Sequence, residues 1–251
     1  MATPAELVVR IRLLDWAGLR ALWADVKAGD TPGWEAGEAL KYLVLKQNKD
    51  GAFAVNGAPT THMYAHGLAT IAICEAYALT ADPALRRPAQ LALNYIARAQ
   101  SAEGGWRYEA RNPKGYDTSV GGWEVMALKS GQMAGLEVPT ITWRGATKWL
   151  DAAQSADGGG YGYTSPGETP TLSAVGLLCR QYLGWGPGSP GLIAGARRLQ
   201  ESGPMAKNMY YNYYATQVLH HLAGPGWEIW NRRMRDQLVA AQDREIGRAH
   251  V

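Results

Sequence analysis

Three side chains in or beside apolar helical sequence are candidates for acid-base chemistry. Glu124 interrupts a run of small and apolar residues, and burial of a carboxyl group favours its protonated form, which can donate a proton. Asp117 precedes the same run, and His66 supplies an imidazole that titrates near neutral pH. The predicted catalytic residues are therefore Glu124, Asp117 and His66. The structural alternatives are a paired acid for Glu124 and a helix N-cap for Asp117.

The histidines do not make a complete metal site. His62 lies four residues before His66, so the two share a helix face. Zinc needs a third protein ligand, and no glutamate follows His62 as a metalloprotease helix requires. Cys74 and Cys179 stand alone in apolar runs, without a second cysteine at metal-ligand spacing. We therefore predict no metal and no cofactor, with helix-capping or cavity-lining roles as alternatives for the histidines.

Aromatic residues with a polar group dominate the chain. It has 10 tryptophans and 13 tyrosines but one phenylalanine, and the densest cluster is the segment 210–214. When the apolar segments of the repeats are aligned, Trp123 occupies the position that matches Tyr214. Aromatic faces attract cations and line sites for amphiphilic ligands, although at helical spacing they also form cores. The predicted ligand-binding residues are His62, Trp123, Tyr210, Tyr211, Asn212 and Tyr214.

A repeated motif sets the elements that must position these residues. A glutamine, a few polar or small residues, a glycine and an aromatic residue recur with glutamines 53 and 54 residues apart. A weaker copy begins at Gln200, and another begins at Gln242 and breaks off. A period near fifty residues predicts one supersecondary unit stacked repeatedly. The three full copies run from Gln47 to Phe53, from Gln100 to Trp106 and from Gln154 to Tyr161.

The apolar period between motifs is helical, and each repeat divides into two helices. One is apolar nearly all round, which predicts an inner helix, and the other has a charged stripe that faces water. The expected inner helices are 64–79, 119–133, 172–183 and 210–222, and the expected outer helices are 85–100, 141–154, 192–200 and 227–242. This predicts an all-α protein of about four and a half hairpins. Periodicity alone does not distinguish an open solenoid from a ring.

The motif resembles the QW motif of squalene-hopene and oxidosqualene cyclases. The alternation of inner and outer helices is similar to the prenyltransferase and squalene-cyclase repeat superfamily, over roughly residues 34–242. The resemblance implies an α/α toroid with a central cavity, here a partial one of four to five hairpins. It also implies a structural role for the motif residues Gln47, Phe53, Gln100, Trp106, Gln154 and Tyr161.

The reaction signatures of that superfamily are missing. The chain contains no Asp-x-Asp-Asp, no Asp-Asp-x-x-Asp and no Asp-x-Cys of a zinc-binding prenyltransferase subunit. The resemblance therefore predicts a cavity that binds an apolar or amphiphilic, isoprenoid-like ligand, and it leaves catalysis undecided. The alternative is a non-catalytic repeat scaffold that binds a protein or a glycan.

Composition and the chain ends give the remaining expectations. The formal charge is +3 over 251 residues with no basic block, which argues against nucleic acid. No apolar stretch reaches the length of a membrane span, and the start lacks a signal-peptide pattern, so localisation is left open.

We divide the chain into a poorly assigned helical segment 1–33, a toroid domain 34–245 and a non-native tail 246–251. An incomplete ring predicts a fragment, or self-association through its open edge.

Overall fold

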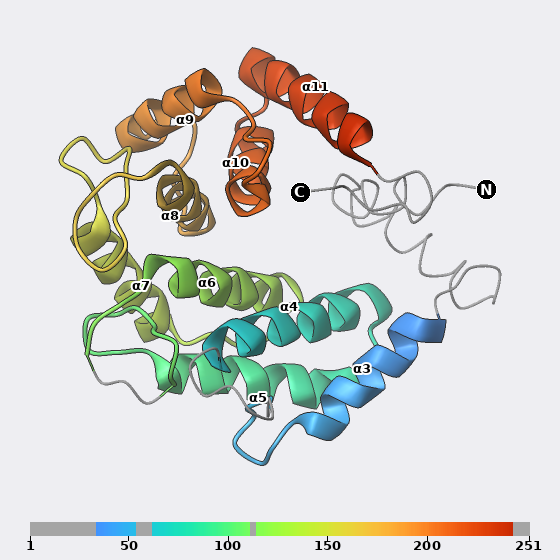
Figure 1. The fold of residues 1–251 in the computed structure, drawn as a ribbon. Helices are drawn as coiled ribbons and strands as arrows, with labels where there is room; N and C mark the ends of the chain where they lie inside the picture. Colours follow the sequence, from blue (N-terminus) through green and yellow to red (C-terminus); the bar gives the residue numbers. More distant parts are fainter. Residues whose placement is uncertain (1–33, 54–61, 111–113, 243–251) are drawn as a thin grey trace. The chain divides into compact units, whose positions relative to one another are not determined.

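The computed structural model describes residues 34–53, 62–110 and 114–242 (Figure 1). Within these ranges the chain forms nine α-helices and no strand. The prediction of an all-α protein is confirmed. The segments 1–33 and 246–251, and all of the motif copy at Gln242 beyond the glutamine itself, lie outside the described residues.

Helices form over all four ranges predicted for inner helices, and we keep the names inner and outer for the two sets. Each starts and ends within two residues of its predicted limits, and α8 buries eight consecutive residues, 173–180. Local side chains cap the starts of α8 and α10, where Thr169 accepts a hydrogen bond from the Leu172 amide and Asn208 accepts one from the Tyr211 amide. The inner helices are α4 (His62–Thr80), α6 (Thr118–Met133), α8 (Pro170–Tyr182) and α10 (Met209–Leu222).

The predicted outer helices alternate with the inner ones along the chain. They bury a single stripe of residues, as α11 does with Trp230 and Met234. A charged face opposite one apolar stripe is typical of a helix at the protein surface. The helices in the predicted outer ranges are α5 (Pro83–Ala99), α7 (Thr140–Ala153), α9 (Pro190–Ser202) and α11 (Gly224–Ala241), and a further helix, α3 (Trp34–Lys46), precedes α4.

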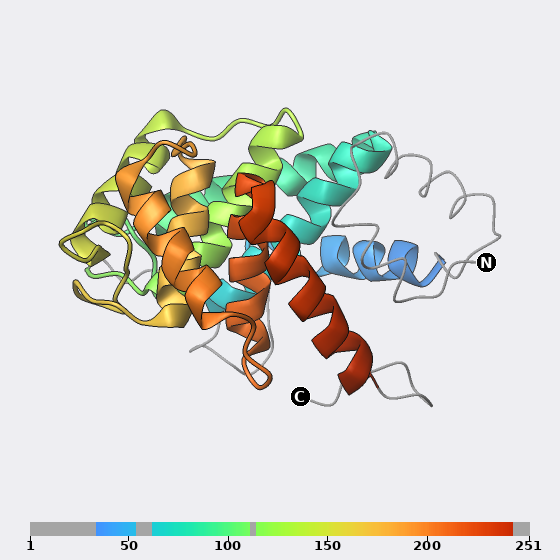
Figure 2. The ribbon, with the colours of Figure 1, turned by 90° about the horizontal axis from the view of Figure 1, so that it is seen from above.

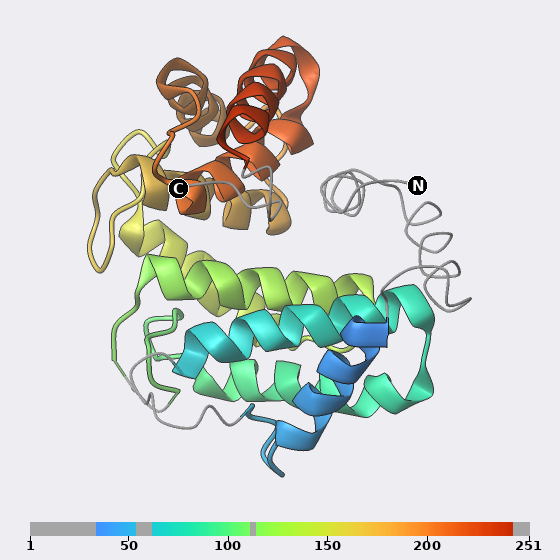
Figure 3. The ribbon, with the colours of Figure 1, turned by 45° about the vertical axis from the view of Figure 1, so that its right-hand side comes forward.

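Inner helices pack against the outer helices that follow them. Figure 3 shows α4 alongside α5, and the two are joined by the imidazole of His66, whose Nε2 lies 3.1 Å from the Ala92 carbonyl oxygen. Trp230 of α11 donates from Nε1 to the Thr216 hydroxyl of α10 at 2.9 Å. The pairs α6–α7 and α8–α9 meet at glycines, Gly121 and Gly195. With α3, the described part of the chain therefore contains four and a half hairpins, as predicted.

Contacts divide the chain into two compact units. The first contains α3, α4, α5 and the part of α6 from Ala127 onward. The second contains α6 up to Met126 and the helices from α7 to α11. Within the second unit the inner helices α8 and α10 lie side by side (Figure 1, Figure 2).

Candidate functional site

The first two motif glutamines make the same pair of hydrogen bonds. Gln100 donates from Nε2 to the carbonyl oxygen of Gly104 at 2.7 Å and to that of Thr142, at the start of α7, at 2.9 Å. One amide group therefore closes its own turn and also holds the next outer helix. The corresponding bonds of Gln47 run to the carbonyl oxygens of Gly51 (3.1 Å) and Pro88 of α5 (2.9 Å).

The third motif adds a buried arginine. Gln154 donates from Nε2 to the Gly158 carbonyl at 3.1 Å, while its Oε1 accepts from Nη2 of Arg180 at 2.9 Å. The same guanidinium donates to Asp151 at 2.6 Å and to the Tyr161 hydroxyl at 3.0 Å. Arg180 is 3% exposed, so its contacts join α7, the motif turn and α8 inside the second unit. Sequence reasoning missed this residue, because it lies within an apolar run.

The motif glycines bring each turn close to a neighbouring helix. Gly51, Gly104 and Gly158 have φ of +91°, +90° and +77°, a region that favours glycine. A β-carbon added to Gly104 would lie 2.0 Å from the carbonyl oxygen of Gly145 in α7. The motif aromatics Phe53, Trp106 and Tyr161 are all buried.

The weaker copy at Gln200 has a related contact. A β-carbon on Gly226 of α11 would lie 2.0 Å from Nε2 of Gln200, and one on Gly145 of α7 would lie 2.6 Å from Nε2 of Gln100. In both cases the glutamine amide is seated against a glycine of the next outer helix. The repeat therefore continues through Gln200, although the motif there has lost its aromatic residue.

Glu124 is a buried carboxyl group on the inner helix α6. Its side chain is 0% exposed, and neither carboxyl oxygen has a hydrogen-bond partner among the described residues. Burial raises the pKa of Glu124 well above its usual value. Burial therefore favours the neutral carboxylic acid, the form that can donate a proton or a hydrogen bond.

Small residues next to Glu124 explain how α6 is enclosed so tightly. A β-carbon on Gly121 would lie 2.5 Å from the Trp149 ring, and one on Gly122 would lie 2.4 Å from Val175. Large neighbours therefore reach the backbone of α6 directly at Gly121 and Gly122, which excludes water from this part of the helix.

The pH dependence of stability tests the state of Glu124. A carboxyl group whose folded pKa is raised keeps its proton in the folded state after the unfolded chain has lost it. Stability therefore falls as pH rises from the unfolded pKa, near 4.5, to the raised folded value, with a slope of up to about 1.4 kcal/mol per pH unit. We expect Glu124→Gln to remove this slope. The free energy of unfolding of the variant should therefore increase relative to that of the wild type as pH rises. Urea unfolding between pH 4 and pH 9 measures the difference. If the free energies of unfolding of the two proteins changed with pH in the same way, Glu124 would be ionised in the folded protein.

Four aromatic rings from α6 and α10 form one cluster, which we call the aromatic cluster. Trp123 stacks on Tyr213 with ring centroids 5.6 Å apart and an interplanar angle of 24°. Tyr214 meets Trp123 edge-on at 5.6 Å, and Tyr210 lies 6.1 Å from it. The Tyr210 hydroxyl donates to the Ser119 carbonyl of α6 at 3.1 Å, which fixes its position. Three predicted ligand residues thus meet, together with Tyr213, which had not been singled out.

Exposure differs among the members of the aromatic cluster. Tyr214 is fully buried, and burial raises its pKa well above the usual value. Trp123, Tyr210 and Tyr213 are half-buried. Glu124 follows Trp123 directly, so the two side chains leave α6 about 100° apart.

The other two residues predicted from this segment have different surroundings. Tyr211 meets Trp230 of α11 edge-on, with ring centroids 5.9 Å apart. Asn212 accepts a hydrogen bond from the Met205 amide at 2.8 Å and donates to the Met205 carbonyl at 2.7 Å. Its side chain therefore closes the turn that leads into α10.

The two histidines are held within the first unit. The Phe53 amide donates to Nδ1 of His66 at 3.4 Å, so the proton of the neutral ring lies on Nε2, which donates to the Ala92 carbonyl at 3.1 Å. Burial lowers the pKa of His66 to about 4. His66 is therefore neutral at pH 7, with both ring nitrogens engaged. His62 shares a 2.9 Å hydrogen bond with the Tyr95 hydroxyl, and burial lowers its pKa.

Asp117 caps the start of α6, which was the structural alternative for this residue. Its Oδ1 accepts hydrogen bonds from the amides of Ser119 and Val120 at 2.9 and 3.2 Å, and from the Ser119 hydroxyl at 2.6 Å. These are the contacts of a helix N-cap. The side chain is buried, and Oδ2 has no hydrogen-bond partner among the described residues.

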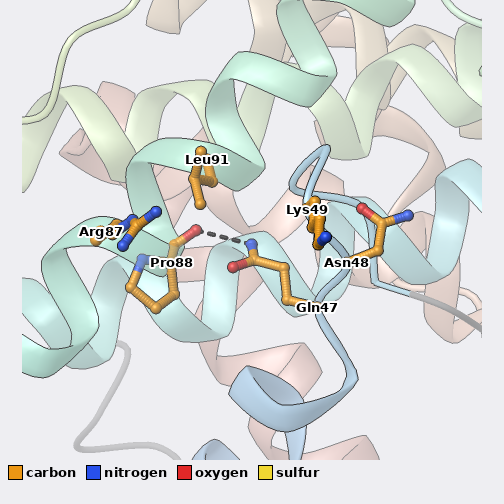
Figure 4. Close-up of a pocket in the computed structure, with 6 residues that line it drawn as sticks. All are labelled: Gln47, Asn48, Lys49, Arg87, Pro88 and Leu91. Carbon is orange, nitrogen blue, oxygen red and sulfur yellow. Dashed lines mark hydrogen bonds between the residues drawn. The ribbon is translucent and has the colours of Figure 1, made fainter.

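A recess in the first unit was not predicted (Figure 4). It has a volume of about 520 Å³ and lies where the first motif turn meets α5. Two of its side chains, Lys49 and Arg87, are cationic. The lining residues are Gln47, Asn48, Lys49, Arg87, Pro88 and Leu91.

No protein-family model matches the chain, and no curated protein matches its sequence. In the described ranges, no three histidine, cysteine, aspartate or glutamate side chains gather in a way that would hold a metal ion. None of the helices described combines the length and apolar character that crossing a membrane requires.

Proposed function

We propose that the chain is a partial α/α toroid of the prenyltransferase and squalene-cyclase type that binds an apolar or amphiphilic, isoprenoid-like small molecule. The observation that carries the binding proposal is the aromatic cluster, in which Trp123 is stacked among three tyrosines and three of the four rings are partly accessible. The matching hydrogen bonds of Gln47 and Gln100 support the repeat architecture.

The chemistry of the aromatic cluster suits such a ligand. Tyrosine and tryptophan rings provide large apolar faces that pack against hydrocarbon, and their π-systems attract positive charge. Each ring also carries a hydroxyl or an indole N–H, so the cluster combines polar groups with apolar faces. The Tyr210 hydroxyl already bonds the backbone of α6, so the ring is held in place before a ligand arrives.

Catalysis depends on Glu124 more than on the other candidates. The Asp117 carboxylate caps α6, and both nitrogens of His66 make hydrogen bonds within the first unit. Glu124 is the remaining candidate acid. Burial favours its protonated form, and its oxygens have no hydrogen-bond partner among the described residues, as a general acid requires before it meets a substrate. We therefore propose ligand binding first and proton donation by Glu124 as a second step.

Direct incubation separates binding from turnover. The protein is incubated with squalene and with polyprenyl diphosphates, and bound ligand and new products are followed by mass spectrometry. We expect Trp123→Ala to weaken binding by about tenfold, since one stacking face contributes roughly 1–1.5 kcal/mol. Trp143→Ala is the control, because Trp143 is half-buried on the outer helix α7. If Glu124 donates a proton, Glu124→Gln abolishes turnover and leaves binding unchanged.

The incubation can also overturn the binding proposal. Absence of both binding and products, with the helical circular-dichroism spectrum intact, would overturn the proposal. The structural roles of His66 and Asp117 favour a non-catalytic protein in that case. The scaffold alternative, with a protein or glycan partner, would then take its place.

A further inference from the structure

The recess beside the first motif turn has two cations and no carboxylate in its lining. Lys49 comes from the motif turn and Arg87 from α5, and both are exposed. Neither side chain makes an ion pair or a hydrogen bond with any residue in the described ranges. Figure 4 shows them on opposite sides of Gln47 and Leu91. Two uncompensated cations around one recess favour an anionic ligand.

Asn48 is a neutral polar residue in the lining of the same recess. Its Oδ1 accepts hydrogen bonds from the amides of Asp50 and Ala52, both at 3.0 Å. These bonds fix the orientation of the side-chain amide, because only the oxygen can accept them. Its Nδ2 group is consequently left as a donor, and no described residue accepts from it. The recess therefore presents an ammonium and a guanidinium, and the Asn48 N–H₂ lies at its edge, on the side away from Arg87 (Figure 4).

The remaining lining is apolar or already satisfied. Pro88 and Leu91 contribute hydrocarbon, and the Gln47 amide is engaged with the Pro88 carbonyl (Figure 4). This bond joins the motif turn to α5, so the two sides of the recess are held together before any ligand binds. The volume of about 520 Å³ lies within the range of small-molecule sites.

We infer that this recess binds the phosphate group of a small phosphorylated molecule. Guanidinium and ammonium groups are the preferred protein partners of phosphate. The apolar side chains of Pro88 and Leu91 accommodate a short hydrocarbon part. The site belongs to the first unit and is separate from the aromatic cluster, which belongs to the second.

Calorimetric titration of the full chain at low ionic strength tests the inference. The probes are inorganic diphosphate and octyl phosphate, which distinguish a free phosphate from one attached to a hydrocarbon chain. We expect both probes to bind at one site, with Lys49→Ala and Arg87→Ala each weakening binding by about tenfold. Arg86→Ala is the matched control, since Arg86 is an exposed neighbour on α5 outside the lining. It should change affinity by less than about twofold.

Asn48→Asp gives a more specific test of phosphate binding in the recess. Aspartate keeps an oxygen for the amides of Asp50 and Ala52, so the turn is retained, but it replaces the N–H₂ donor by a negative oxygen. We expect it to weaken binding of both probes by more than tenfold, with an unchanged circular-dichroism spectrum. Trp123→Ala should leave diphosphate binding unaltered, so this site and the proposed ligand site can fail independently. No binding to the folded wild type, or an equal loss in Arg86→Ala and Arg87→Ala, would overturn the inference.

Discussion

Replacing Arg180 with leucine is expected to lower the free energy of unfolding by about 3–5 kcal/mol. The guanidinium is buried and donates to Asp151, Gln154 and the Tyr161 hydroxyl. Removing it leaves the buried Tyr161 hydroxyl and the part-buried Gln154 amide oxygen without this donor, and a buried group without a partner costs about 1–3 kcal/mol. Urea unfolding followed by circular dichroism measures the loss.

Arg198→Ala is the control for the Arg180 variant. Arg198 pairs with Asp157 and Glu168, but all three side chains are at least 33% exposed, so the loss should be about 1 kcal/mol or less. An equal loss in Arg180→Leu and Arg198→Ala would show that the arginine network contributes little to stability.

A double variant identifies the cause of the loss. The amides of Phe53 and Tyr161 donate to His66 and Ser173, which places these two inner-helix residues at matching positions. Seven residues further on, the first repeat has Ile73 where the third has Arg180. The first repeat therefore combines Phe53, which has no hydroxyl, with the apolar Ile73. The third repeat combines Tyr161 with Arg180, which donates to the tyrosine hydroxyl. Adding Tyr161→Phe to Arg180→Leu should cost less than the sum of the two single changes.

Replacing Gly104 with alanine is expected to cost about 3 kcal/mol or more. The residue has φ of +90°, and a β-carbon would lie 2.0 Å from the Gly145 carbonyl oxygen of α7. Backbone strain and a backbone clash therefore act together, and the clash can be relieved only if the motif turn moves away from α7. That movement would also stretch the bonds of Gln100 to Gly104 and Thr142.

Gly135 provides a matched control for Gly104. Its φ is +73°, and a β-carbon there would meet nothing within 4 Å. Gly135→Ala should therefore cost about 1 kcal/mol from backbone strain alone. The difference between the two variants in urea unfolding isolates the close approach of the motif turn to α7. Equal losses would mean that the turn is not seated against the helix.

The helices could be predicted from local sequence because their ends carry local signals. Thr169 and Pro170 mark the start of α8, and the Thr169 side chain accepts the amide of Leu172. The motif turns were recognisable for the same reason, since their glycines have positive φ. Such features depend on residues within a few positions of one another.

The missed features depend on contacts that are distant in sequence. Arg180 lies in an apolar run, and its partner Tyr161 is 19 residues earlier. The recess exists because Gln47 bonds Pro88, 41 residues away. The role of His66 was likewise open until its bond to Ala92 was known. No periodicity in the sequence specifies such pairs.

The acceptors of the motif glutamines have a consequence for how such a chain evolves. Gln47 and Gln100 donate only to main-chain carbonyl oxygens, which every residue type possesses. Substitutions on the receiving helix therefore leave the joint chemically intact, so long as the helix keeps its path. Neighbouring repeats can diverge in sequence while the same joint continues to assemble them, whereas Gln154, bound to the Arg180 side chain, can change only together with its partner.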